Sequence, residues 1–106
     1  MEQDFLEMSP ENQYRELWAE YMGTRPGNEE LLQWMEREGF FEAPASAKHH
    51  GNFPGGLCQH SINVAMEALD LCATPAFKGV PPQEAIAAAL LHDIAKIGNY
   101  LHGRDG

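Results

Sequence analysis

The sequence has few cysteines and no long apolar run. Its 106 residues include two cysteines, Cys58 and Cys72, and they form no Cys-x-x-Cys pair. On one expected helix these two residues would lie roughly 20 Å apart, which is too far for a disulfide. Without a signal peptide or a transmembrane stretch, we expect a cytoplasmic chain that does not enter a membrane and keeps both thiols reduced in its core.

Basic residues are also scarce. Seven Lys and Arg stand against 16 Asp and Glu, which gives a formal net charge of -9. This charge disfavours long-range attraction to nucleic acid or to an anionic membrane, so a small substrate is expected instead. A bound cation can still reverse the field within a cleft. With 43% apolar residues, the composition is that of a folded globular domain with one core.

The apolar periodicity predicts four helices and no strand, and therefore an all-α fold. Ser9 and Asn28 are the expected N-caps of the first two helices, and Gly23 and Gly39 are their expected ends. The predicted ranges are about 10–23, 28–39, 57–72 and 82–97. The fourth is apolar almost all round, which indicates the central buried helix of the domain. Four aromatic residues are expected in the core or at its edge: Trp18, Trp34, Phe40 and Phe41.

We expect one compact domain with two parts. Residues 1–39 form an N-terminal helical pair, and residues 40–106 carry the polar chemistry. A long loop rich in Pro and Gly opens the second part and contains His49 and His50. A domain of this size is only marginally stabilised by its own core, so we expect a homodimer whose contact the first two helices supply.

The pair His92-Asp93 lies in an otherwise apolar helical segment, where a polar group without a partner costs on the order of 1–3 kcal/mol. Neutral imidazole and carboxylate are good ligands for divalent metals. Adjacent helical residues point about 100° apart, yet both can reach one ion if their rotamers converge. Packing the third helix against the fourth would bring His60 to the same ion. Three such donors leave positions for water, as in a catalytic metal site.

Other interpretations of these residues stay open at this point. A histidine such as His60 on an apolar helix is more often a satisfied core residue than a ligand. The His92-Asp93 pair could be a salt bridge or a hydrogen-bonded core feature without any ion. His49 and His50 could be solvated loop residues without a role.

Two segments resemble the leading motifs of the HD-domain metal-dependent phosphohydrolases. They read Gly55-Gly56-Leu57-Cys58-Gln59-His60-Ser61, followed by Asn63-Val64-Ala65, and Leu90-Leu91-His92-Asp93-Ile94-Ala95-Lys96-Ile97. The similarity is closest to members with a Gly-Gly-Leu…His segment ahead of a helix, such as YhaM-type exoribonucleases and phage-like HD proteins. It covers approximately residues 40–97.

The resemblance implies a single HD-like helical bundle that holds a divalent metal (Mn, Fe, Ni, Co, Zn or Mg) through His60, His92 and Asp93. It implies hydrolysis of a phosphoester, with a nucleotide or related small phosphate compound as the expected substrate. Asp93 would orient or deprotonate the attacking water. Lys96 and the loop residue His50 would offset charge on the phosphate.

The family's fourth ligand, an Asp tens of residues beyond the His-Asp pair, has no counterpart in the printed sequence. Asp105 is only twelve residues past Asp93 and lies in a polar, glycine-flanked segment that we expect to be a frayed terminus. Either the chain is truncated, or water, a substrate oxygen or a second chain completes the coordination. The alternative function is a non-catalytic helical module that binds a metal, a ligand or a partner.

Overall fold

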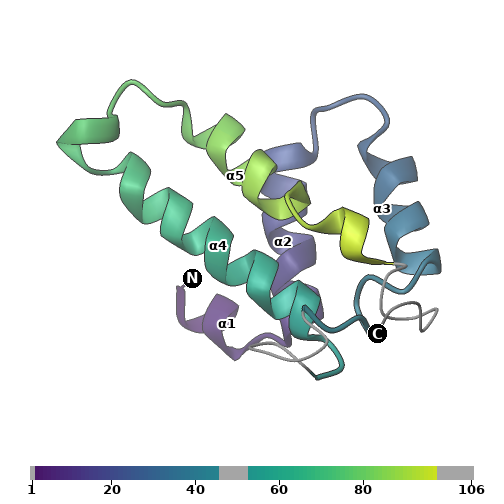
Figure 1. Cartoon of the computed structure of the whole chain (residues 1–106). Coiled ribbons are helices and arrows are strands. Elements are labelled where there is room, and N and C mark those ends of the chain that lie inside the picture. The colour runs from purple at the N-terminus through teal and green to yellow at the C-terminus, as the bar shows by residue number, and fades with distance from the viewer. Residues whose placement is uncertain (1, 46–52, 98–106) are drawn as a thin grey trace.

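The computed structural model describes residues 2–45 and 53–97, which form helices joined by turns (Figure 1). The elements are α1 (Glu2–Glu7), α2 (Pro10–Met22), α3 (Asn28–Arg37), α4 (Gly56–Cys72), the 3-10 turn η1 (Pro75–Phe77), α5 (Pro82–Leu91) and the 3-10 turn η2 (Ile94–Lys96). No strand occurs in these two ranges, and the all-α prediction is confirmed.

The first two predicted helices are α2 and α3. The Ser9 hydroxyl accepts a hydrogen bond from the Asn12 amide at 3.2 Å, so its predicted N-cap role is confirmed. The cap predicted at Asn28 is wrong, because Gly27, with a φ of 83°, takes the N-cap position of α3. The Asn28 side chain instead accepts a hydrogen bond from Trp18 Nε1 at 3.1 Å, which links α3 to α2.

The sequence does not predict α1, which is too short to show a helical period. A contact with another element holds it, because Gln13 Nε2 of α2 donates to the Phe5 carbonyl at 2.9 Å. Phe5 itself packs against the core.

By contrast with α1, the helix α4 begins and ends within one residue of its predicted range.

The core lies among α2, α4 and α5. In Figure 1, α4 and α5 run antiparallel and side by side, and α2 packs against both. Both predicted parts of the chain contribute to this one core, whose largest fully buried side chains are Tyr14, Met35, Phe40, Leu57, Ile86 and Leu90. Trp18 and Phe41 are also buried as expected, but the core prediction is wrong for Trp34, which is 40% exposed on α3.

No helix among the described residues has both the length and the apolar character needed to cross a bilayer. The predicted homodimer stays a prediction.

Gly55 forms the joint at which the chain enters α4. Its φ of 85° lies in the left-handed region, and the Gly55 amide donates to the Glu42 carbonyl at 3.1 Å. One step later the Leu57 amide donates to the Ala43 carbonyl at 2.9 Å. The start of α4 is thus bonded to the chain that follows α3, and a non-glycine residue at this joint would be strained.

We predict that Gly55→Ala lowers the free energy of unfolding by about 1–2 kcal/mol, the cost of a left-handed backbone for an L-residue. An added Cβ would lie 3.6 Å from the Phe41 carbonyl oxygen, which is ordinary contact, so backbone strain alone sets this cost. Urea unfolding followed by circular dichroism measures it. Gly79→Ala is the matched control: open space surrounds Gly79, and its φ is not positive. Equal stability of the two variants would contradict the prediction.

The two cysteines differ in environment. Cys58 is 1% exposed in the core, whereas Cys72 is partly exposed at the end of α4, and both are free thiols. Burial, reinforced by the negative charge of Glu11, raises the pKa of the Cys58 thiol to about 12. The Cys58 thiol therefore stays protonated near neutral pH, and its prediction as a core thiol is confirmed, whereas the core prediction is wrong for Cys72.

We predict that iodoacetamide at pH 8 alkylates Cys72 in the folded protein and leaves Cys58 unmodified, because the thiolate is the nucleophile and Cys58 is both buried and protonated. Mass spectrometry of the intact chain should show one adduct. Cys72→Ser should then show none under native conditions and one in urea. Modification of Cys58 in the folded Cys72→Ser variant would contradict this assignment.

Candidate metal centre

Three of the predicted site residues converge at one edge of the α4–α5 pair. His60 Nε2 lies 3.4 Å from Asp93 Oδ2, and His92 Nε2 lies 3.0 Å from the same oxygen. The two imidazole rings are 5.2 Å apart between centroids. Each residue offers one donor atom, and the three atoms all lie within 4.8 Å of one another. Among the described residues, this group of two histidines and one aspartate could hold a metal ion.

The helix that leads to His92 and Asp93 ends earlier than the sequence predicts. A continuous helix to Ile97 is wrong, because α5 stops at Leu91 and Asp93 leaves the helical region with φ -118° and ψ 17°. In a continuous helix the Ala89 and Leu90 carbonyls would accept from the amides four residues later. Here the Ala89 carbonyl lies 2.7 Å from His92 Nδ1, and the Leu90 carbonyl accepts from the Tyr14 hydroxyl at 2.6 Å.

The break changes the direction in which the two adjacent candidate ligands, His92 and Asp93, point. On a regular helix, His92 and Asp93 would point about 100° apart. The change of backbone direction after Leu91 instead lets both side chains approach His60, which α4 presents near its beginning. The side chain of Asp93 is 18% exposed, against 42% for His60 and 34% for His92. The carboxylate is therefore the inner group of the three and the imidazoles are the outer ones.

The hydrogen bond to Ala89 defines which nitrogen of His92 faces the site. A carbonyl only accepts, so Nδ1 carries the proton and donates, and neutral His92 presents the Nε2 lone pair to Asp93. A lone pair and a carboxylate oxygen 3.0 Å apart repel each other unless a positive charge lies with them. A second proton on His92 or a divalent cation would supply it. The donor set of two imidazoles and a carboxylate, with one imidazole oriented by a carbonyl, is the kind that Zn, Mn, Fe, Co and Ni accept.

Lys96 is the fourth polar group at this edge. Its Nζ lies 3.4 Å from Asp93 Oδ2 and donates a hydrogen bond to the Ala45 carbonyl at 3.1 Å. Lys96 thus joins the site to the segment that follows α3. The sequence reveals the lysine itself, but a backbone carbonyl such as that of Ala45 leaves no signal in a residue pattern.

Other candidate residues lie outside the described part of the chain. These are His50 with the predicted catalytic role, His49 and Asp105. Their assignments stay predictions. The Tyr14 hydroxyl also reaches the end of α5, at the Leu90 carbonyl, and nothing in the sequence pattern signals this contact.

The described geometry can be compared with known proteins. Dihydroneopterin 2',3'-cyclic phosphate phosphodiesterase of Methanocaldococcus jannaschii is 41% identical to this chain over 68 residues, which are 61% of this chain and 27% of that protein. The chain thus spans about a quarter of that relative's length. No solved structure matches the chain significantly.

A protein-family model covers the site. The model TraI_2, described as "Putative helicase", matches residues 38–104, which include all of α4, α5 and η2 and therefore the four residues of the site. Because this match takes in more than half of the sequence, the chain belongs to the TraI_2 family.

Proposed function

We propose that this chain carries the metal centre of an HD-type phosphohydrolase and cleaves a phosphoester with the help of a divalent cation. The observation that carries this proposal is the convergence of His60 Nε2 and His92 Nε2 on Asp93 Oδ2, at 3.4 and 3.0 Å. The residue types and their order also match the HD resemblance described above. The name of the Methanocaldococcus jannaschii relative gives a cyclic phosphodiester as that protein's substrate, which supports a phosphoester for this chain.

His60, His92 and Asp93 would hold the cation, and three protein donors leave room for water and a substrate oxygen. Once bound, a divalent cation lowers the pKa of a water molecule and polarises a phosphoryl oxygen. The Ala89 carbonyl fixes the His92 ring through Nδ1, so Nε2 is the coordinating atom. This preorganisation would keep the donor atoms in place before substrate arrives.

Asp93 would also handle the proton of the attacking water. Its contacts with described residues all involve Oδ2. Oδ1 is therefore the atom we assign to orienting the water and accepting its proton. The Asp93 carboxylate would thus bind the cation through Oδ2 and the water through Oδ1, which agrees with its position between both imidazoles and the lysine.

Lys96 would bind the phosphate. An ammonium group has three N–H donors; Lys96 donates one to the Ala45 carbonyl, and its charge also lies 3.4 Å from Asp93 Oδ2. A remaining N–H donor can meet a phosphate oxygen and offset charge that builds up during hydrolysis. His50 was predicted to share this task, and that assignment is kept as part of the proposal.

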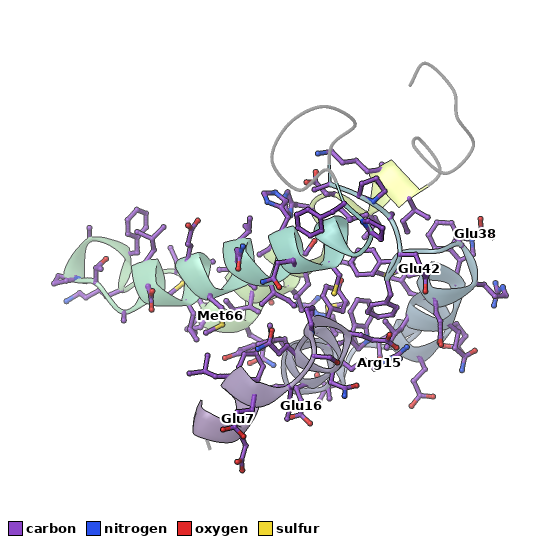
Figure 2. All side chains as sticks on the ribbon, turned by 90° about the horizontal axis from the view of Figure 1, so that it is seen from below. Glu7, Arg15, Glu16, Glu38, Glu42 and Met66 are labelled. Atoms are coloured by element: carbon purple, nitrogen blue, oxygen red, sulfur yellow. The ribbon has the colours of Figure 1, made fainter. Side chains whose placement is uncertain are left out.

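The distribution of charge supports an anionic substrate at this edge. Eleven of the 16 acidic residues lie in the first 45 positions, which build α1, α2, α3 and the turn after them. In Figure 2 the labelled Glu7 and Glu16 lie with α1 and α2, on the side of α4 away from η2, whereas Glu38 and Glu42 lie nearer to η2. A small phosphate compound, such as a nucleotide, would therefore approach the site from the side away from α1 and α2.

The alternative function is a non-catalytic module that binds the metal alone. One observation favours it: the described residues offer three donor atoms, one fewer than the set implied by the HD resemblance. In that case the cation would stabilise the fold without turning over a substrate. The two functions differ in the outcome of a hydrolysis assay.

We predict metal-dependent hydrolysis of bis(p-nitrophenyl) phosphate or of members of a panel of 2',3'-cyclic and linear nucleotides, with Mn, Co, Ni, Fe, Zn or Mg supplied separately. His92→Ala should lower kcat/KM at least 100-fold, because outer partners of a ligand alone change metal sites by about 10–100-fold. Lys96→Met should lower it at least tenfold. Lys78→Met is the matched control, since Lys78 is an exposed lysine beyond the far end of α4.

No turnover by the folded wild-type chain with any of these metals would contradict the catalytic proposal. If the metal still binds, that result supports the non-catalytic module. Equal losses in Lys96→Met and Lys78→Met would contradict a phosphate-binding role for Lys96.

We predict that metal binding raises the melting temperature. A cation at 100 times its dissociation constant adds about 2.7 kcal/mol to the stability of the folded state, which for a domain of this size is roughly 10 °C. EDTA should reverse the shift, and His60→Ala should remove it. Thermal scans by circular dichroism, with elemental analysis of the purified protein, measure both. Identical melting with and without EDTA and added metal would instead favour a plain ion pair among the three residues.

A further inference from the structure

Tyr14 is the most buried polar link between the N-terminal helices and the metal centre. It lies on α2, is 0% exposed, and donates its hydroxyl proton to the Leu90 carbonyl at 2.6 Å. Leu90 is two residues before His92. Tyr14 itself lies outside residues 38–104, the segment that the family model matches.

The acceptor of this hydrogen bond is the carbonyl that a continuing helix would need. In an unbroken α5 the Leu90 carbonyl would accept from the amide of Ile94. The Tyr14 hydroxyl takes its place, and α5 ends one residue later, at Leu91. Asp93 then turns out of the helical region and η2 begins. The hydroxyl therefore lies at the point where the backbone changes direction toward His60.

The ring of Tyr14 is held on several sides, so the hydroxyl has a fixed position. Its centroid lies 4.7 Å from that of Phe40, 5.8 Å from Phe41 and 5.9 Å from Trp18. Burial, together with the nearby Cys58, raises the pKa of the Tyr14 hydroxyl above its ordinary range. The hydroxyl therefore stays protonated near neutral pH and can donate its hydrogen bond.

We propose that Tyr14 is a positioning residue of the metal centre: through its hydrogen bond to Leu90 it fixes the end of α5 and so the placement of His92 and Asp93 relative to His60. This proposal rests on the proposed metal site. It assigns to α2 a part in the site that the resemblance, confined to residues 40–97, does not include. Tyr14 touches neither the cation nor the substrate and acts only through the backbone.

The test removes the hydroxyl and retains the ring. Tyr14→Phe should weaken Zn²⁺ binding about tenfold, the lower end of the range for residues that orient metal ligands. Isothermal titration calorimetry at a temperature where circular dichroism shows each protein fully folded measures this affinity. Tyr21→Phe is the matched control on the same helix: Tyr21 is partly buried, and its hydroxyl makes no hydrogen bond with another described residue.

A purely structural hydroxyl would lower the melting temperature and leave the Zn²⁺ affinity unchanged. Unchanged affinity in Tyr14→Phe therefore overturns this proposal while leaving the proposed function intact. If the wild-type protein binds neither Zn²⁺ nor any of the other divalent cations named above, the proposed function fails and this proposal fails with it. A tenfold loss in Tyr21→Phe as well would show a general effect of α2 and would also overturn it.

A measurement on the wild-type chain covers the case in which Tyr14→Phe does not fold. During a Zn²⁺ titration followed by NMR, the carbonyl carbon of Leu90 should shift with the same midpoint as the ring carbons of His92. Coupled shifts support a link from the Tyr14 hydrogen bond to the ligand. A Leu90 carbonyl that does not respond to Zn²⁺ overturns it.

Discussion

The end of α5 at Leu91 is the constraint on which the site depends. Two carbonyls at this point, those of Ala89 and Leu90, do not accept from the amides four residues later: the Leu90 carbonyl accepts from the Tyr14 hydroxyl, and the Ala89 carbonyl lies within hydrogen-bond distance of the His92 amide and of His92 Nδ1. Had the helix continued, Asp93 would have pointed about 100° away from His92 and the two could not both approach His60 so easily. The helix stop thus converts a pair of neighbours in sequence into a pair of convergent donors.

The same break also determines the electrostatics of the site. Asp93 Oδ2 lies near two imidazole nitrogens and the Lys96 ammonium, at 3.0–3.4 Å. With both imidazoles neutral, the arrangement concentrates electron-rich atoms at one point and leaves the lysine as the positive group. A cation placed among them would relieve that crowding, whereas protonation of the imidazoles would give an ion pair. Because the imidazoles are a third or more exposed, solvent and small ligands can reach the space between them and Asp93 Oδ2.

Local chemistry explains which features could be predicted from the sequence. Ser9 caps α2 by accepting a hydrogen bond from the Asn12 amide three residues later. The helical spacing of apolar residues predicts α4, which is 17 residues long. The meeting of His60 with the His-Asp pair was also expected, because packing of two apolar helices brings their polar ends together. The cap at Gly27 and the length of α5 were not predicted correctly. The α5 stop depends on Tyr14, 76 positions away from Leu90, and a contact at that separation has no local sequence signature.

The N-terminal helices and the site-bearing segment are energetically one unit. Tyr14, Trp18 and Met22 of α2 are each no more than 4% exposed and belong to the same core cluster as Leu57 of α4 and Leu90 of α5. Burial of a large apolar side chain contributes about 1.5–3 kcal/mol, so without α2 the facing sides of α4 and α5 would lose a large share of their stabilisation. Residues 38–104 therefore contain the candidate site residues, but the core on which they are built also includes the helix that precedes them.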